Sequence, residues 1–182
     1  MNLRTRFLGL AAFTFIALGF GATTLWAQPV TLTEFTLNGQ GTTNFTTGPC
    51  AGLACSSGNP SDCGCDETTG SITGTNVSAG TFVIKDQLLL TGATGNGTSS
   101  CIPSSGTITV MANSGAVLKL NFSGPACKVP NVNWVMLGGG YGVVAGTLRF
   151  ANAIGSGTLS RAKNQSNGDT TVSLVGNISL NP

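Results

Sequence analysis

Alternating apolar and polar residues mark the strands of this chain, most clearly over residues 170–180. One face of that segment is apolar, and the other carries hydroxyl and amide side chains. The apolar face consists of Val172, Leu174, Gly176, Ile178 and Leu180. Because successive side chains of a strand point to opposite faces, this pattern predicts a half-buried antiparallel strand.

A β-hairpin is predicted by two alternating segments that flank an Asn-Ser-Gly turn. These segments are residues 107–112 and 116–122. In the second arm, Leu118, Leu120 and Phe122 share one face, while lysine, asparagine and serine occupy the other. The turn residues and the alternation together indicate two neighbouring antiparallel strands.

Residues 81–90 predict another strand, whose apolar face is interrupted by a carboxylate. That face consists of Phe82, Ile84, Leu88 and Leu90. Asp86 falls on the same face, so in a barrel it would point into the lumen, where burial would raise its pKa. The alternative is that the strand twists or bulges and that Asp86 pairs with Lys85 or another cation on the outside.

Shorter segments of the same kind predict the remaining strands. They cover residues 29–37, 71–77, 134–137, 141–144, 147–150 and 158–161. Residues 124–133 contain two prolines and are expected to form a loop. No window after residue 27 predicts an amphipathic helix, so the domain is predicted to be all-β. Closure into a barrel would remove its exposed strand edges.

Gly-Thr pairs recur at residues 80–81, 106–107, 146–147 and 157–158. Glycine permits a sharp turn and threonine favours extended structure, so each pair is expected to open a strand. Residues 141–160 contain two such pairs, and the segment between them, residues 151–155, is expected to form a corner of small residues.

Residues 141–160, YGVVAGTLRFANAIGSGTLS, resemble a segment of the allene oxide cyclase and dirigent-like barrels. In that family a strand runs into a Gly-Thr-Gly-x-Phe-x-x-Ala-x-Gly-x-Gly corner. The matching residues here are Gly146, Thr147, Phe150, Ala153, Gly155 and Gly157, whereas Leu148 replaces the second family glycine. The resemblance implies an antiparallel eight-stranded calycin-like barrel with an apolar lumen.

The plant enzymes of that family cyclise or guide reactive hydrophobic intermediates. Secreted bacterial members of unknown function carry the barrel without a known reaction, and this chain is more similar to those. The resemblance does not place the polar catalytic residues of the plant enzymes on this chain position by position, so no catalytic residue is carried over.

Six cysteines in an exported chain predict three disulfides. Cys101 and Cys127 flank the predicted hairpin, so a bond between them would clamp its open ends. The other four cysteines lie within residues 49–69, a stretch without periodicity that is expected to be a disulfide-crosslinked insertion loop. They are Cys50, Cys55, Cys63 and Cys65.

We expect these four cysteines to pair among themselves, with Cys63–Cys65 the least favourable pairing because its ring is so short. A zinc site is the alternative. However, structural zinc sites prefer CxxC-like pairs, and the spacings here are CxxxxC and CxC. We therefore predict no metal and no other cofactor.

Few other side chains suggest a functional site. Asp62, Asp66 and Glu67 lack the ligand spacing of calcium loops and are expected to form a solvated acidic loop. The chain has no histidine, which excludes catalytic triads that use histidine and metal sites with histidine ligands. Tyr141 and Trp134 are expected to be core or barrel-mouth aromatics. With Asp86, they are also the candidates for binding a ligand.

The first 27 residues predict an export signal, and residues 28–182 a single β-barrel domain. Arg4 and Arg6 precede the apolar residues 7–20, and Ala27 ends a plausible cleavage site. A retained membrane anchor is the alternative, since about 20 apolar residues span a bilayer. We expect cleavage, a secreted or periplasmic protein, and no stable membrane insertion afterwards.

Charge excludes several partners. Without Arg4 and Arg6, six of the eight basic residues remain and balance the six acidic residues. No basic patch suggests nucleic-acid binding or a membrane surface. Only 8% of the chain is charged, which is typical of a secreted β-protein or of an adhesive surface protein.

Three functions are compatible with the sequence. The first is a non-catalytic binding or structural module that holds a small apolar ligand in its lumen. The second is a cyclase-like or isomerase-like enzyme in which Asp86 or Glu34 supplies the polar group. The third is a surface or filament-forming subunit that self-associates through exposed strand edges and Thr/Asn-rich strands. An open apolar lumen with one buried carboxylate would favour the enzyme, and a filled lumen the structural role.

Overall fold

The computed structural model describes residues 31–94, 100–129 and 133–180. The predicted signal peptide, residues 1–27, lies outside them. Within the described residues, no helix has the length and apolar character needed to cross a membrane.

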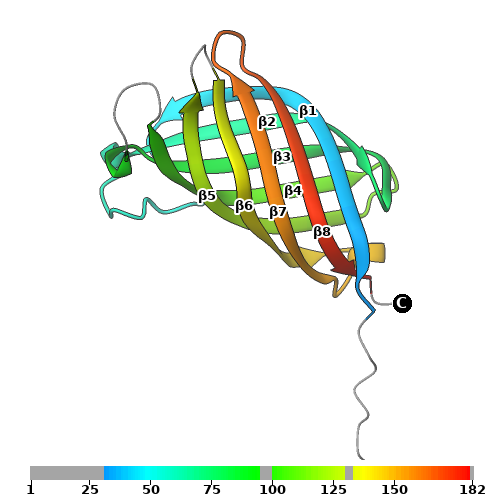
Figure 1. The fold of residues 1–182 in the computed structure, drawn as a ribbon. Helices are drawn as coiled ribbons and strands as arrows, with labels where there is room; N and C mark the ends of the chain where they lie inside the picture. Colours follow the sequence, from blue (N-terminus) through cyan, green and yellow to red (C-terminus); the bar gives the residue numbers. More distant parts are fainter. Residues whose placement is uncertain (1–30, 95–99, 130–132, 181–182) are drawn as a thin grey trace, which may run out of the picture.

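The protein is all-β, and its strands form one closed antiparallel barrel of eight strands (Figure 1). The strands are β1 (Thr33–Thr47), β2 (Cys63–Gly74), β3 (Val77–Leu89), β4 (Cys101–Ala112), β5 (Val117–Val129), β6 (Asn133–Gly146), β7 (Ile154–Asn164) and β8 (Asp169–Ser179). Each strand pairs with its neighbour in the chain, and β8 returns to pair with β1. The predicted fold class is confirmed, and the barrel is consistent with a calycin-like architecture.

The insertion loop is shorter than predicted. Residues 49–69 were expected to be a loop, but β2 begins at Cys63 and residues 64–69 pair with both β1 and β3. The alternation is hidden there because both faces are covered. Cys63 and Cys65 are buried on the outer side by the preceding loop, while Asp66 points inwards. The sequence of a strand that is buried on both faces does not alternate between apolar and polar residues.

Two further segments predicted as separate strands form one. Residues 134–137 and 141–144 both belong to β6, and a bulge between Met136 and Gly139 absorbs the triple glycine. The loop prediction over residues 124–133 is wrong as far as Val129, because β5 continues there. Pro125 of β5 lies directly opposite Pro103 of β4. The two residues that lack a backbone N–H therefore face each other.

The predicted strand at residues 147–150 is a 3₁₀ turn, η4 (Leu148–Phe150), which crosses the end of the barrel. Leu148 adopts a left-handed backbone conformation, with φ of 52°, at the position where the resembling family has glycine. Its side chain is exposed, whereas Phe150 is fully buried and closes that end of the interior.

The Gly-Thr pairs do not open strands, because three of the four lie within them. Their glycines stand where neighbouring strands approach too closely for a side chain. A Cβ at Gly106 would lie 1.9 Å from the carbonyl oxygen of Lys85, and one at Gly157 would lie 2.2 Å from that of Val175. These glycines therefore permit the coiling that closes a small barrel.

An apolar core fills one end of the barrel. Phe35, Phe82 and Phe150 are its largest fully buried side chains, and the face predicted for residues 170–180 contributes Val172, Leu174 and Ile178. The interior is therefore packed from the β2–β3, β4–β5 and β6–β7 connections towards the middle. The opposite end, towards the β1–β2 and β7–β8 connections, is not filled in this way.

All six cysteines form disulfides, and each lies in the described part of the chain. Cys101 and Cys127 are bonded across β4 and β5, in agreement with the hairpin prediction. The loop cysteines pair as Cys50–Cys65 and Cys55–Cys63, which leaves none of these four thiolates for a metal. Three disulfides indicate a protein that folds outside the reducing cytoplasm.

Candidate functional site

The unfilled end of the barrel contains a cavity of about 420 Å³. Its wall is apolar and is formed by Leu88, Leu90, Ile102, Ala126, Trp134 and Met136. Phe45, Leu90 and Gln165 are exposed, so they lie at the rim, where the cavity opens to solvent. The volume lies within the roughly 300–1,000 Å³ typical of small-molecule sites.

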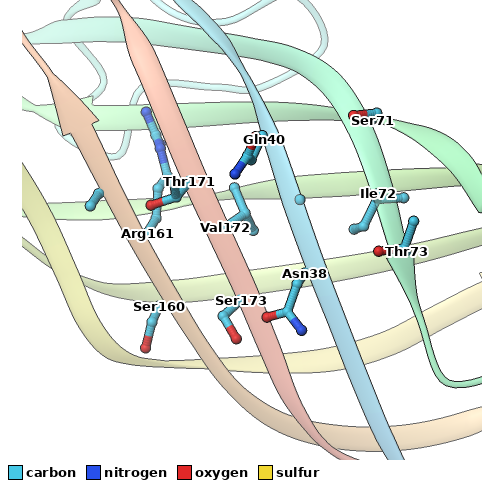
Figure 2. A pocket seen from close by; sticks show the side chains of 12 residues that line it. Asn38, Gln40, Ser71, Ile72, Thr73, Ser160, Arg161, Thr171, Val172 and Ser173 are labelled. Carbon is cyan, nitrogen blue, oxygen red and sulfur yellow. The ribbon is translucent and has the colours of Figure 1, made fainter.

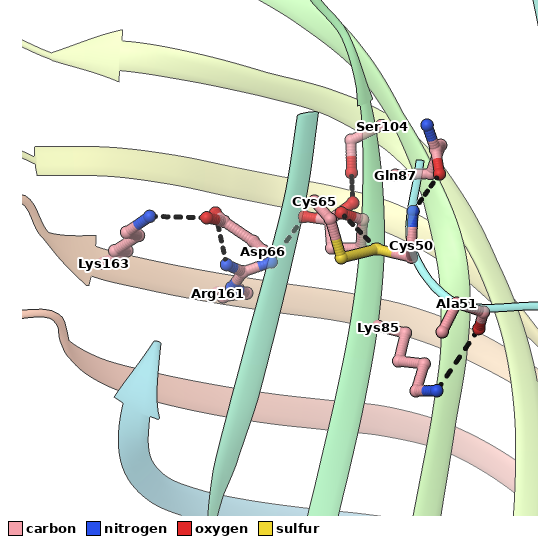
Figure 3. The surroundings of a disulfide bond; sticks show 10 residues. Cys50, Ala51, Cys65, Asp66, Lys85, Gln87, Ser104, Arg161 and Lys163 are labelled. Atoms are coloured by element: carbon pink, nitrogen blue, oxygen red, sulfur yellow. Dashed lines mark hydrogen bonds and ion pairs between the residues drawn. A yellow bond between two sulfur atoms is a disulfide. The ribbon is translucent and has the colours of Figure 1, made fainter. Parts of the chain in front are cut away.

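Four charged side chains form the floor of this cavity: Asp66, Asp86, Arg161 and Lys163. The Arg161 guanidinium donates to both carboxylates, through Nη1 to Asp86 and through Nη2 to Asp66 Oδ2 at 2.9 Å. Lys163 Nζ donates to Asp66 Oδ1 at 2.6 Å. We call these four residues the ionic floor; Figure 3 shows most of its contacts beside the Cys50–Cys65 disulfide.

The strand register brings the ionic floor together. Asp66 of β2 lies directly opposite Asp86 of β3, and both point inwards. Arg161 and Lys163 are two residues apart on β7, so they share the inner face of that strand. The ion pairs therefore cross the lumen between elements that are 75 to 97 residues apart in the chain.

Burial dominates the electrostatics of Asp86. Removal from water raises the pKa of its carboxyl, although the Arg161 charge and a hydrogen bond from the Ser104 hydroxyl oppose this shift. The nearby Asp66 carboxylate raises the pKa further. With all four groups ionised, two negative charges face two positive charges, so the ionic floor is balanced.

A cluster of three buried threonines lies next to the ionic floor. Thr43 shares short hydrogen bonds of 2.6 Å with Thr68 of β2 and with Thr170 of β8. Thr68 is one inward position along β2 from Asp66, and Thr170 lies opposite Lys163. The three hydroxyl groups lie between the charged groups and the apolar core and form hydrogen bonds with one another. Buried polar groups need such partners.

The predicted inward position of Asp86 agrees with the structure, because its side chain lies in the lumen and lines the cavity. The alternative pairing with Lys85 outside the barrel is wrong. Lys85 Nζ instead donates to the carbonyl oxygen of Ala51 in the cysteine loop, at 3.2 Å. Glu34, the other carboxylate considered for an enzyme, is exposed on β1 and does not line the cavity.

The two aromatic candidates, Trp134 and Tyr141, lie in different parts of the barrel. Trp134 lines the cavity and packs against its apolar wall. Tyr141 lies instead in the apolar core, where its hydroxyl oxygen lies against the paired glycines Gly157 and Gly176. Burial raises the pKa of Tyr141 to about 12. Its hydroxyl has no hydrogen-bond partner among the described residues, so Tyr141 is a core residue rather than part of the cavity.

Asp66 was expected in a solvated acidic loop, and that prediction is wrong for this residue. It is 4% exposed, whereas Glu67, its neighbour in the chain, is exposed on the outer face of β2. Arg161, Lys163 and Ser104 were also missed. The only indication was the spacing of Leu159, Arg161 and Lys163, which places two charges on the apolar face of one strand.

The Cys50–Cys65 disulfide covers the outside of the strands that carry the ionic floor (Figure 3). The backbone N–H of Cys50 donates to Gln87 Oε1 at 2.9 Å, and Gln87 lies between Asp86 and Leu88 of the cavity. Carboxylates on one side of β2 and β3 are thus backed by a crosslinked loop on the other. This arrangement fixes the floor of the cavity rather than leaving it on a mobile element.

Comparisons with known proteins assign no relative: no family model, no curated protein and no solved structure matches the chain.

Proposed function

We propose that the barrel is a binding module that takes up a small molecule with an apolar body and a polar end through its open mouth. The observation that carries the proposal is the position of a balanced, buried ionic floor at the bottom of an apolar cavity of about 420 Å³. The apolar wall contributes hydrophobic binding, while the ionic floor orients the polar end.

Lys163 is the floor residue best placed to meet a ligand. Its side chain is 13% exposed, compared with 4% for Arg161, and it extends past the Phe45 ring at the rim. Both Asp86 oxygens already accept hydrogen bonds, one from Ser104 and one from Arg161. The same holds for Asp66, whose two oxygens accept from Arg161 and Lys163. The ligand's polar end is therefore expected to bind near Lys163, with the two carboxylates holding Arg161 and Lys163 in place.

The protein is proposed to be a secreted or periplasmic member of the allene oxide cyclase and dirigent-like barrels. Closed eight-stranded topology and the η4 corner at residues 148–150 support this assignment. The export signal at residues 1–27 and the three disulfides support the location.

Ligand uptake can be tested through the fluorescence of Trp134. The chain contains two tryptophans, Trp26 and Trp134, so protein comprising residues 28–182 reports from the cavity alone. We expect saturable changes in this emission on titration with at least one of decanol, decanoate and decylamine. These probes share an alkyl body and differ in the charge of the polar end.

A matched pair of variants makes the test specific. Ala126→Phe inserts a ring into the cavity wall and is expected to abolish the saturable change, whereas Ser123→Phe places the same ring on the exposed face of β5 and should not. Native mass spectrometry should show a one-to-one adduct that Ala126→Phe loses. No saturable change with any probe, or equal effects of both variants, would refute uptake into the lumen.

A cyclase-like or isomerase-like enzyme is the second candidate, and the raised pKa of Asp86 favours it. Burial raises the pKa of the Asp86 carboxyl, and a carboxyl group that holds its proton more tightly than usual is suited to act as a general acid. If the second candidate holds, turnover of a hydrophobic substrate is lost in Asp86→Asn while binding persists. Binding without turnover leaves the binding module as the function.

Self-association through strand edges, the third function considered from the sequence, has little support from the fold. β1 pairs with β8, so the eight described strands form a ring without a free edge. Any filament or surface assembly would have to use side chains on the outer face of the barrel.

A further inference from the structure

A hollow of about 480 Å³ lies on the outer face of the barrel, over β1, β2, β7 and β8. Six of the side chains that border it are Asn38, Gln40, Ser71, Ser160, Thr171 and Ser173, and we call them the polar hollow (Figure 2). All six are at least partly exposed to solvent. The polar hollow is separate from the cavity described above, because its side chains point away from the lumen.

The register aligns these side chains in two rows across the sheet. Asn38 of β1 lies opposite Ser173 of β8, which in turn lies opposite Ser160 of β7. Gln40 lies opposite Thr171 on one side and Ser71 on the other. Directly opposed residues on one face have Cβ atoms about 4.5–5.5 Å apart, so each row presents adjacent hydrogen-bonding groups.

Glycines on the inner face allow β1 and β2 to approach closely beside the hollow. A Cβ at Gly41 would lie 2.2 Å from the carbonyl oxygen of Thr69, and one at Gly70 would lie 2.1 Å from that of Gln40. Gly41 and Gly70 are directly opposed in β1 and β2. The close approach of β1 and β2 beside the hollow is therefore a property of the backbone.

The hydrogen-bonding groups of the polar hollow are free. Within the described residues, none of its six side chains makes a hydrogen bond to another part of the protein. Arg161 also borders the hollow, but its guanidinium is bonded to Asp86 and Asp66 inside the barrel. These six side chains thus offer two carboxamides and four hydroxyls without a net charge.

We propose that the polar hollow is a second binding site, specific for neutral oligosaccharides. An apolar ligand would desolvate these amides and hydroxyls without replacing their hydrogen bonds, which is unfavourable. A charged ligand would find no counter-charge within the hollow. A neutral polyhydroxylated chain provides both donors and acceptors along its length, and carboxamides and hydroxyls can bond to either.

The site can be mapped by titrating isotope-labelled protein, residues 28–182, with cellohexaose, maltohexaose or chitohexaose. We expect at least one of them to shift the backbone amide resonances of β1, β2, β7 and β8 around the hollow, while the resonances of cavity residues on other strands, Leu88, Ile102, Ala126 and Trp134, stay in place. The cationic chitosan hexamer and an anionic oligogalacturonate serve as charged counterparts and are expected to bind more weakly.

The double variant Asn38→Ala/Gln40→Ala removes both carboxamides, and its matched control, Thr107→Ala/Asn121→Ala, removes an opposed polar pair from the outer face of β4 and β5. Loss of two hydrogen bonds is expected to weaken binding about tenfold or more in the first variant and to leave affinity unchanged in the control. Both variants should unfold at the same denaturant concentration as the parent protein.

Several results would overturn the proposal. They are the absence of resonance shifts with every neutral oligosaccharide, equal or tighter binding of the charged oligomers, and equal affinities of the two double variants. Shifts confined to the cavity residues would assign the sugar to the lumen and would also overturn it. Because the polar hollow is tested on the outer face, Ala126→Phe should leave oligosaccharide binding intact.

Discussion

At the scale of single residues, the ionic floor is costly to keep. Moving a charge from water into a protein interior costs several kcal/mol per ion, and ion pairing in the lumen offsets this only partly. Arg161 is 5% exposed and its Nε has no partner among the described residues. Replacement of such clusters by apolar residues is often neutral or stabilising. The cluster is therefore better explained by the specificity of the cavity than by stability.

The raised pKa of Asp86 predicts a specific dependence of stability on pH. The native protein holds this proton more tightly than the unfolded chain, whose value is 3.8. The resulting stabilisation is complete below that value and is lost as pH rises through the higher native pKa. The free energy of unfolding of the parent protein relative to Asp86→Asn should therefore fall as pH rises above 3.8.

Urea unfolding of both proteins between about pH 3 and about pH 8 measures this difference. Glu34→Gln, which removes an exposed carboxylate from β1, controls for the change in net charge. A difference that grows with pH would show that Arg161 outweighs burial and lowers the pKa of Asp86.

The sequence allowed Asp86 to be identified but not its partners, for a physical reason. Asp86 interrupts an otherwise apolar face, so its inward direction follows from its own strand. Asp66 lies among cysteines and acidic residues that hide the alternation of β2. Arg161 is 75 residues from Asp86, and only the barrel register brings the two together.

At the scale of strands, glycines inside the sheet control its curvature. They allow close approach of neighbouring backbones at positions where any side chain would collide. The Tyr141 hydroxyl lies against one such pair, Gly157 and Gly176, and occupies space that side chains there would need. Aromatic side chains that cover glycines are one of the devices that fix the register of a bent sheet.

Gly106→Ala is predicted to destabilise the barrel, because its Cβ would lie 1.9 Å from the Lys85 carbonyl oxygen. Gly140→Ala is the matched control, since a Cβ there would have no heavy atom within 4 Å. We expect a loss of about 2 kcal/mol or more for Gly106→Ala and a change below about 1 kcal/mol for Gly140→Ala. Equal losses in urea unfolding would mean that the β3–β4 pair can separate at this point.

Strand prediction succeeded where alternation was regular and failed where other constraints dominated. The segments at residues 81–90, 107–122 and 170–180 were identified because each has one buried and one exposed face. Proline, the triple glycine and the cysteines suggested breaks in β5, β6 and β2 that the structure does not contain. A bulge or a covering loop tolerates these residues within a strand, and neither has a local sequence pattern.

At the scale of the whole molecule, the barrel is asymmetric. One end is packed with apolar side chains and closed by Phe150, and the other holds the cavity and the ionic floor. Apolar burial at the packed end stabilises the fold and offsets the unfavourable desolvation of the charges at the other end. This division explains why the protein carries disulfides near the open end, where the hydrophobic core is smallest.

The loss of stability on removing each disulfide is predicted to increase with the length of chain that the disulfide encloses. Their sequence separations are 26 for Cys101–Cys127, 15 for Cys50–Cys65 and 8 for Cys55–Cys63. Loop-closure entropy gives losses of about 3.5, about 3.0 and about 2.5 kcal/mol in that order. Urea unfolding of the three double-serine variants measures the ranking. A largest loss for Cys55–Cys63 would show that native contacts held in place by this bond outweigh its constraint on the unfolded chain.

β1 and β8, the first and last strands, pair with each other, so the ring of hydrogen bonds closes only when both are present. A nascent or partly translocated chain that lacks β8 exposes two strand edges and an open apolar interior, which favours aggregation. Chaperones that hold the chain unfolded until synthesis is complete would therefore serve this protein directly. The same adjacency means that a circular permutant, cut in the β4–β5 turn and joined across β8 and β1, preserves every strand pair.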